Sequence, residues 1–237
     1  MKKNSIPESI EIHSKELIKS SIKVYLTVLG PLGTAIDEVL FGIGDRIRTK
    51  RLEKFVEELS SVLKNIDEKY INRDFRKTDE LHDVLIPTIG HSIKTRHLEK
   101  IRLYARILVD SFEPNNDTET SEDFLYIVSN LTLKDIRVLK SSIELTEELK
   151  VEKLKSTDPK EFDDFINTTK LLNRLELSEA DITFSLTKLS VFGLLKEYYS
   201  GMVFGNTPGG NFKNTGKLTQ FYRIMTTTNN GEHEEPL

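Results

Sequence analysis

The chain has 237 residues, of which 37% are hydrophobic and 30% are charged, and its formal net charge is −4. It contains no cysteine, which excludes disulfides, thiolate metal ligands and a cysteine nucleophile. The lack of a basic excess disfavours a dedicated nucleic-acid binder. No apolar segment directly follows the basic N-terminus, so we expect no signal peptide and a cytoplasmic protein.

The most apolar stretch, Ile22–Ile43, includes Pro31 and the carboxylates of Asp37 and Glu38. Two carboxylates are costly in lipid, so the stretch predicts a buried helical hairpin that turns at Gly30–Gly33. Peripheral contact with a membrane stays open as an alternative for this segment.

A long helix is expected over Thr34–Tyr70, because its apolar residues recur in steps of three and four. The seam consists of Leu52, Val56, Leu59, Leu63, Ile66 and Tyr70. Such a seam is typical of a helix that packs along another helix. The partner helix can belong to the same chain or to a second copy, and the pattern does not distinguish these two possibilities.

Two further helices are expected over Thr78–Lys94 and Thr95–Phe112. Pro87 should kink or interrupt the first of them. The segment Glu113–Asp123 lacks apolar periodicity, and we predict a loop and hinge there.

Two segments share a capping pattern that predicts helix starts. Thr132 precedes Asp135 by three residues, and Ser178 precedes Asp181 by the same interval. Between them, Lys155–Lys160 is expected to be a linker. It divides a helical domain (1–155) from a C-terminal module (160–226), and a disordered tail (227–237) follows.

The C-terminal module has the element order of a winged helix. Helices are expected over Glu161–Leu175 and from Ser178, with Gly193 as the residue that ends the second one. A strand from Leu194, a Gly-rich turn over Gly205–Asn211, a strand from Phe212 and a helix capped by Thr215 complete it. The predicted fold is therefore mainly α, a helical bundle with long antiparallel helices and a winged-helix-like module.

Basic residues concentrate in two stretches that could share one face and bind an anion, an anionic lipid surface or a partner. They are Arg46, Arg48, Lys50 and Arg51, followed by Lys94, Arg96, Lys100, Arg102 and Arg106. The alternative is two solvated helix faces that acidic neighbours balance.

In the winged-helix-like module, the candidate contact residues are Lys188, Lys213 and Lys217. These cations are few, and base reading needs Arg, Lys, Asn or Gln on the recognition helix. A protein–protein or structural role is therefore favoured over DNA binding.

No catalytic, cofactor-binding or metal-binding residues are predicted, and no cofactor is expected. The five histidines are scattered, and neither a nucleophile elbow nor a phosphate-binding loop occurs. A hydrolase would need a carboxylate or histidine cluster that forms only in three dimensions.

The ordered features resemble the Abi-alpha family of bacterial proteins, which are associated with abortive phage infection. The resemblance runs from about Leu29 to Met225. It consists of the Gly30–Gly33 turn and the segments Arg46–Leu52, Leu81–Ile93, Arg102–Val109, Leu131–Ile136 and Leu186–Leu195. It implies a non-catalytic interaction protein of antiphage defence, which binds a protein partner, self-associates or touches a membrane. A winged-helix transcription regulator is the alternative.

Overall fold

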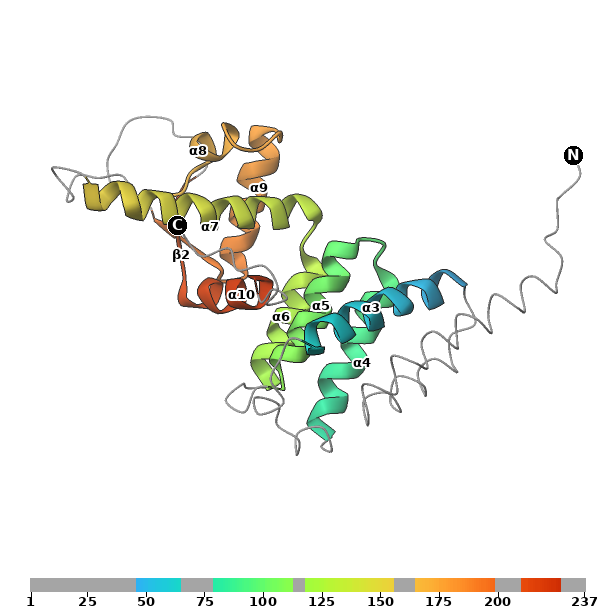
Figure 1. The fold of residues 1–237 in the computed structure, drawn as a ribbon. Helices are drawn as coiled ribbons and strands as arrows, with labels where there is room; N and C mark the ends of the chain where they lie inside the picture. Colours follow the sequence, from blue (N-terminus) through green and yellow to red (C-terminus); the bar gives the residue numbers. More distant parts are fainter. Residues whose placement is uncertain (1–45, 65–78, 113–117, 156–164, 199–209, 227–237) are drawn as a thin grey trace, which may run out of the picture. The chain divides into compact units, whose positions relative to one another are not determined.

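The computed structural model describes residues 46–64, 79–112, 118–155, 165–198 and 210–226. The predictions for Ile22–Ile43 and for residues 227–237 lie outside these ranges. The described part is mainly helical with one small two-stranded sheet (Figure 1). It divides into two compact units. Unit 1 comprises Met1–Ser129 with Ile224–Leu237, and unit 2 comprises Asn130–Arg223.

Unit 1 is built on α3 (Arg46–Lys64), α4 (Asp79–Lys94), α5 (Leu98–Asp110) and α6 (Thr118–Asn130). Helix α5 is apolar and buried around most of its circumference, and only the face with Glu99, Arg102 and Arg106 is not buried. Such a helix belongs at the centre of a bundle. Accordingly, α5 packs against both α3 and α4. In the part of the predicted seam that α3 contains, Leu52, Val56 and Leu59 are fully buried and Leu63 is half-buried; Ile66 and Tyr70 lie outside the described residues.

Two predictions for unit 1 need adjustment. The expected loop over Glu113–Asp123 is wrong in its second half, because α6 already begins at Thr118. Carboxylates at the start of a helix favour it electrostatically, and apolar periodicity alone does not register this effect. The helix with Pro87 is not interrupted: α4 runs continuously through that residue.

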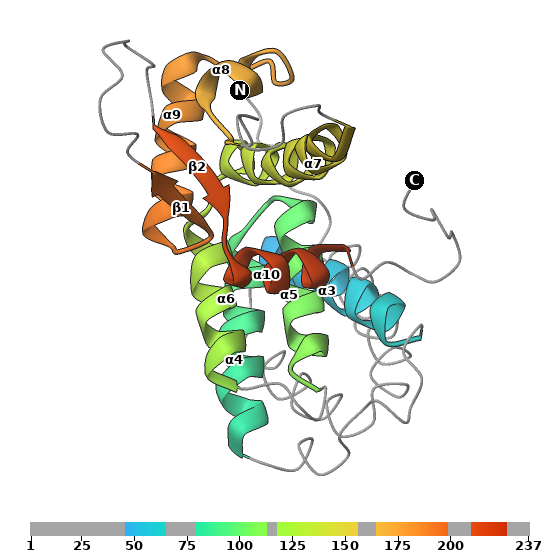
Figure 2. The same cartoon turned by 90° about the vertical axis from the view of Figure 1, so that its left-hand side faces the viewer.

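Unit 2 contains α7 (Leu133–Lys155), α8 (Thr168–Leu172), α9 (Glu179–Val191) and the first residues of α10 (Gly216–Thr226). Strands β1 (Leu195–Tyr198) and β2 (Asn211–Asn214) pair antiparallel (Figure 2). The units divide before α7 and not at residue 155, the boundary expected from composition, because α7 packs against α9.

Local rules fixed most element ends in unit 2. Both predicted helix caps are confirmed, with Thr132 and Ser178 accepting hydrogen bonds from the amides of Asp135 and Asp181 at 3.2 and 3.1 Å. Asp135 completes its box by accepting from the amide of Thr132, whereas Asp181 accepts from the hydroxyl of Ser178. Gly193 follows α9 with φ of +71°, the left-handed conformation that glycine adopts without strain. Thr215 caps α10 by accepting from the amide of Leu218 at 3.2 Å.

The helix expected over Glu161–Leu175 is confirmed only in part, over Thr168–Leu172, and is wrong over residues 165–167; residues 161–164 lie outside the described ranges. Ile166 exchanges two backbone hydrogen bonds with Phe212 of β2, at 2.9 and 2.8 Å. Asn167 then caps α8, which therefore begins only at Thr168. A long-range strand contact thus replaces the helix that the local pattern favoured.

Candidate functional site

The basic residues of unit 1 fall into two groups. Arg51 of α3 donates to the carbonyls of Ile93 and Lys94 at 3.0 and 3.1 Å. It thereby satisfies two of the last carbonyls of α4 and joins the two basic stretches at one place. The exposed side chains at this place are those of Arg46, Arg48, Lys50, Lys94 and Arg96.

The remaining basic candidates form ion pairs or hydrogen bonds within unit 1. Arg102 forms an ion pair with Glu58 at 3.0 Å, and Lys100 is buried and donates to the carbonyl of Ser129 at 3.1 Å. Arg106 donates to the carbonyl of Met225, and burial lowers the pKa of its guanidinium. The structure therefore brings together only part of the predicted patch, at the start of α3 and the end of α4.

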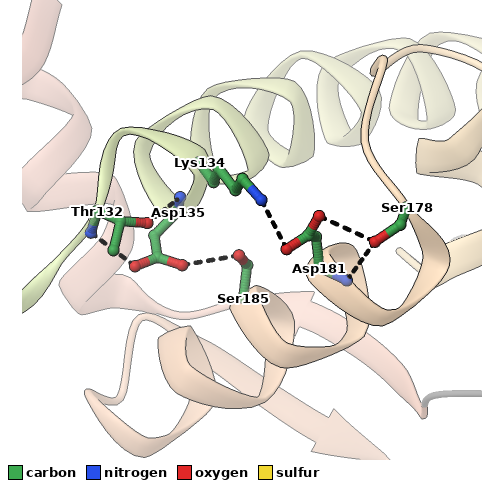
Figure 3. A network of polar contacts seen from close by, with 6 residues as sticks. All are labelled: Thr132, Lys134, Asp135, Ser178, Asp181 and Ser185. Atoms are coloured by element: carbon green, nitrogen blue, oxygen red, sulfur yellow. Dashed lines mark hydrogen bonds and ion pairs between the residues drawn. The ribbon is translucent and has the colours of Figure 1, made fainter.

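In unit 2, a buried carboxylate joins α7 to α9. Asp135 accepts hydrogen bonds from the hydroxyl of Ser185 at 2.7 Å and from the ammonium of Lys188 at 2.8 Å (Figure 3 draws the contact with Ser185). It also accepts from the amide of Thr132 at 2.7 Å, which completes the capping box. Its side chain is only 2% exposed.

The charge of Asp135 is maintained despite its burial. Desolvation by itself raises the pKa of this carboxyl, but the hydrogen bonds from Lys188, Thr132 and Ser185 outweigh it and leave the pKa below its ordinary value. Because its donors come from both α7 and α9, the carboxylate of Asp135 links α9 to α7.

A second polar contact lies beside this network on the surface. Lys134 of α7 donates to Asp181 of α9 at 2.8 Å, and Ser178 donates to the same carboxylate at 2.9 Å (Figure 3). These hydrogen bonds lower the pKa of Asp181, with the bond from Lys134 contributing most. Both contacts orient the first turn of α9.

The outer face of α9 is apolar and exposed, a feature that the sequence reading missed. Phe184 is 67% exposed and Val191 is 79% exposed. Ala180 and Thr187 are also exposed and complete a stripe in steps of four, three and four, whereas the inner face buries Ile182, Leu186 and Leu189. We call Ala180, Phe184, Thr187 and Val191 the outer stripe of α9.

The three basic candidates of the predicted module lie apart from this stripe. Lys188 points to Asp135 on α7. The ammonium of Lys213 on β2 lies 4.4 Å from the ring centre of Phe165 and 5.9 Å from that of Tyr198. Lys217 is in the first turn of α10. The structure therefore gathers no cationic face on α9.

Within the described ranges, no three His, Cys, Asp or Glu side chains gather closely enough to hold a metal ion. Among the helices described there, none combines the length and apolar character needed to cross a membrane. His91 stacks on Tyr104 with ring centres 5.6 Å apart, and burial, followed by Lys94 and Lys100, lowers its pKa.

Compared with known proteins, the chain matches no family model, no curated protein and no solved structure.

Proposed function

We propose that this chain is a non-catalytic interaction protein of bacterial antiphage defence, of the abortive-infection type, which binds a protein partner through the outer stripe of α9. The defence role comes from the resemblance to the Abi-alpha family. The observation that carries the interaction role is the exposure of Phe184 and Val191 on one face of a helix whose other face is hydrogen-bonded to Asp135 of α7.

The proposal includes a winged-helix-like architecture for unit 2. Its support is the element order: α7, the bridge residue Ile166, α8, α9, β1 and β2. The amide and the carbonyl of Phe212 both bond to Ile166, so Ile166 lies on the edge of β2 opposite β1. Helix α9 then occupies the position of a recognition helix, behind the short helix α8.

A protein partner suits this face better than DNA does. DNA contacts come mainly from Arg and Lys on phosphates, with Arg, Lys, Asn or Gln on base edges. The outer stripe has none of these, and Glu179 at the start of α9 adds an exposed carboxylate. Aromatic and aliphatic side chains at the centre of a patch are instead typical of protein interfaces.

The test is a phage challenge of cells that express the full chain, with efficiency of plating as the readout. Phe184→Ser should abolish protection, because it removes the largest exposed apolar side chain of the stripe. Tyr126→Ser is the matched control, since Tyr126 is 62% exposed on α6 of unit 1. It should protect like the unaltered chain. Equal protection by Phe184→Ser and the unaltered chain would contradict the interaction role, and no protection by either would contradict the defence role.

The element order of unit 2 also favours a second candidate, a winged-helix DNA-binding regulator. That function predicts an affinity for duplex DNA that falls steeply with salt, because each phosphate contact releases a counterion. Lys213→Ala and Lys217→Ala should each reduce the salt slope by about one if these residues contact phosphates. Absence of binding at low salt removes this candidate.

A further inference from the structure

Cations from two stretches of the chain meet at the end of unit 1 where α4 ends and α5 begins. The two hydrogen bonds from Arg51 to the last carbonyls of α4 place the first turns of α3 at this end. The connection from α4 to α5, residues 95–97, lies there as well. We call this surface the basic end of unit 1, and its cations are Arg46, Arg48, Lys50, Arg51, Lys94 and Arg96.

The charge of the basic end is not balanced by neighbouring carboxylates. The cations outnumber two to one the carboxylates within three residues of them in the sequence, which are Asp45, Glu53 and Glu99. No ion pair with another described residue is formed by the side chains of Arg46, Lys50, Lys94 and Arg96. Arg51 donates to carbonyls, which leaves its positive charge in place. The basic end therefore attracts negatively charged surfaces.

Exposed aliphatic side chains lie among these cations. Ile47 is 59% exposed and lies one helical turn before Arg51, and Leu98, the first residue of α5, is 39% exposed. Aliphatic side chains interspersed with Lys and Arg suit the boundary between lipid headgroups and acyl chains. The apolar groups enter this boundary while the long basic side chains reach the phosphates. The backbone of a nucleic acid would leave Ile47 and Leu98 in water.

From this combination we propose that the basic end of unit 1 binds the surface of a membrane that contains anionic phospholipids. The contact is peripheral: the cations attract the headgroups, and Ile47 and Leu98 insert between them. A bilayer presents its charges at no fixed spacing, so side chains from α3, α4 and the connection to α5 can all take part. The basic end belongs to unit 1, and the proposal goes beyond the proposed function without depending on it.

The test uses the full chain and co-sedimentation with two kinds of vesicle. One is phosphatidylcholine mixed with anionic phosphatidylglycerol, and the other is phosphatidylcholine alone. The chain should bind the anionic vesicles far more strongly, and salt should weaken this binding by screening. Because the formal net charge of the chain is −4, such an attraction has to come from a local surface.

The double variant Lys94→Gln/Arg96→Gln should weaken binding to the anionic vesicles about 25-fold. Each cation near an anionic membrane surface contributes about fivefold to the affinity. Arg137→Gln/Lys155→Gln is the matched control, since it removes two exposed cations from α7 of unit 2 and changes the net charge equally. The control should bind like the unaltered chain.

A second pair of variants tests the apolar part of the contact. Ile47→Ser should weaken binding severalfold, and the weakening should persist at high salt because insertion of an aliphatic side chain is not screened. Leu154→Ser is the control, since Leu154 is 86% exposed on α7 of unit 2, and it should leave the affinity unchanged.

Several results would overturn the proposal. One is the absence of binding to the anionic vesicles at low salt, and another is an equal loss in the Lys94/Arg96 variant and its control. Loss of binding in Phe184→Ser would place the lipid contact on the outer stripe of α9. Displacement from the vesicles by a duplex oligonucleotide or by polyglutamate at equal charge concentration would assign the basic end to a nucleic acid or to an acidic protein. The phage challenge is read independently, so failure of either proposal leaves the other standing.

Discussion

Replacing Lys188 by methionine should destabilise unit 2 by about 3 kcal/mol, because it leaves a buried carboxylate without its cation. Asp135 retains the amide of Thr132 and the hydroxyl of Ser185 as donors, which limits the loss. Asp135→Asn should cost less, about 2 kcal/mol, because it removes the buried charge and keeps a side-chain acceptor for the cap. The side chain of Lys188 is 21% exposed and can then return partly to water.

The double variant separates the ion pair from the rest of the network. When both charges are removed, no unpaired charge stays buried, so the combined cost should fall about 2 kcal/mol short of the sum of the single costs. Native-state hydrogen exchange of the α9 amides is the appropriate measurement, since it reports on unit 2 separately from unit 1. Costs that add to within about 0.5 kcal/mol would refute the assignment of Asp135 and Lys188 as an energetically coupled pair.

The same pair predicts a dependence on pH. The pKa of Asp135 is lower in the folded chain than its ordinary value of about 3.9. The ionised carboxylate of Asp135 therefore stabilises the fold fully when the pH is above its pKa in the unfolded chain. This stabilisation is lost as the pH falls through its lower pKa in the folded chain. Protection of the α9 amides should decrease below about pH 4, and this decrease should be smaller in Asp135→Asn.

Three further predictions concern other elements. Arg51→Ala should increase exchange of the amides in the last turn of α4 by removing the donor to two carbonyls, whereas Lys54→Ala on the same helix should not. The pKa of His91 is lowered, so unit 1 should lose stability as the pH falls below about 6.5, and thermal unfolding at a series of pH values measures this loss. His91→Phe should keep the ring stack on Tyr104 and abolish this pH dependence. Gly193→Ala should cost about 1 kcal/mol because of the positive φ, and unchanged α9 exchange would contradict that strain.

Short-range rules made the starts of α7, α9 and α10 predictable. Each depends on residues three or four apart, such as Thr132 with Asp135, and those contacts form wherever the chain becomes helical. The error at residues 165–167 occurred where a distant contact decides the structure. Ile166 pairs with Phe212, and no local pattern around Ile166 contains that information.

Local sequence patterns were also insufficient to predict the contacts of the candidate site residues. Lys188 belongs to a set of lysines chosen for their position in a predicted module, but its partner lies 53 residues earlier in the chain. Arg51 likewise serves the end of α4, 42 and 43 residues away. Sequence spacing indicates which face of a helix a cation occupies, but only the fold determines whether a carboxylate or a carbonyl lies opposite that face.

Helix α9 carries apolar side chains on two opposite faces, and this arrangement constrains its role. The inner face is used in full, since Ile182, Leu186 and Leu189 are buried in unit 2. The polar side chains that would suit a surface, Ser185 and Lys188, are drawn to Asp135, while Phe184 and Val191 are left in solvent. A helix of ordinary amphipathic design has the reverse distribution. Covering Phe184 and Val191 with a second apolar surface is favourable at about 25 cal/mol per Å² buried. A phosphate backbone provides no such surface, and a protein partner does.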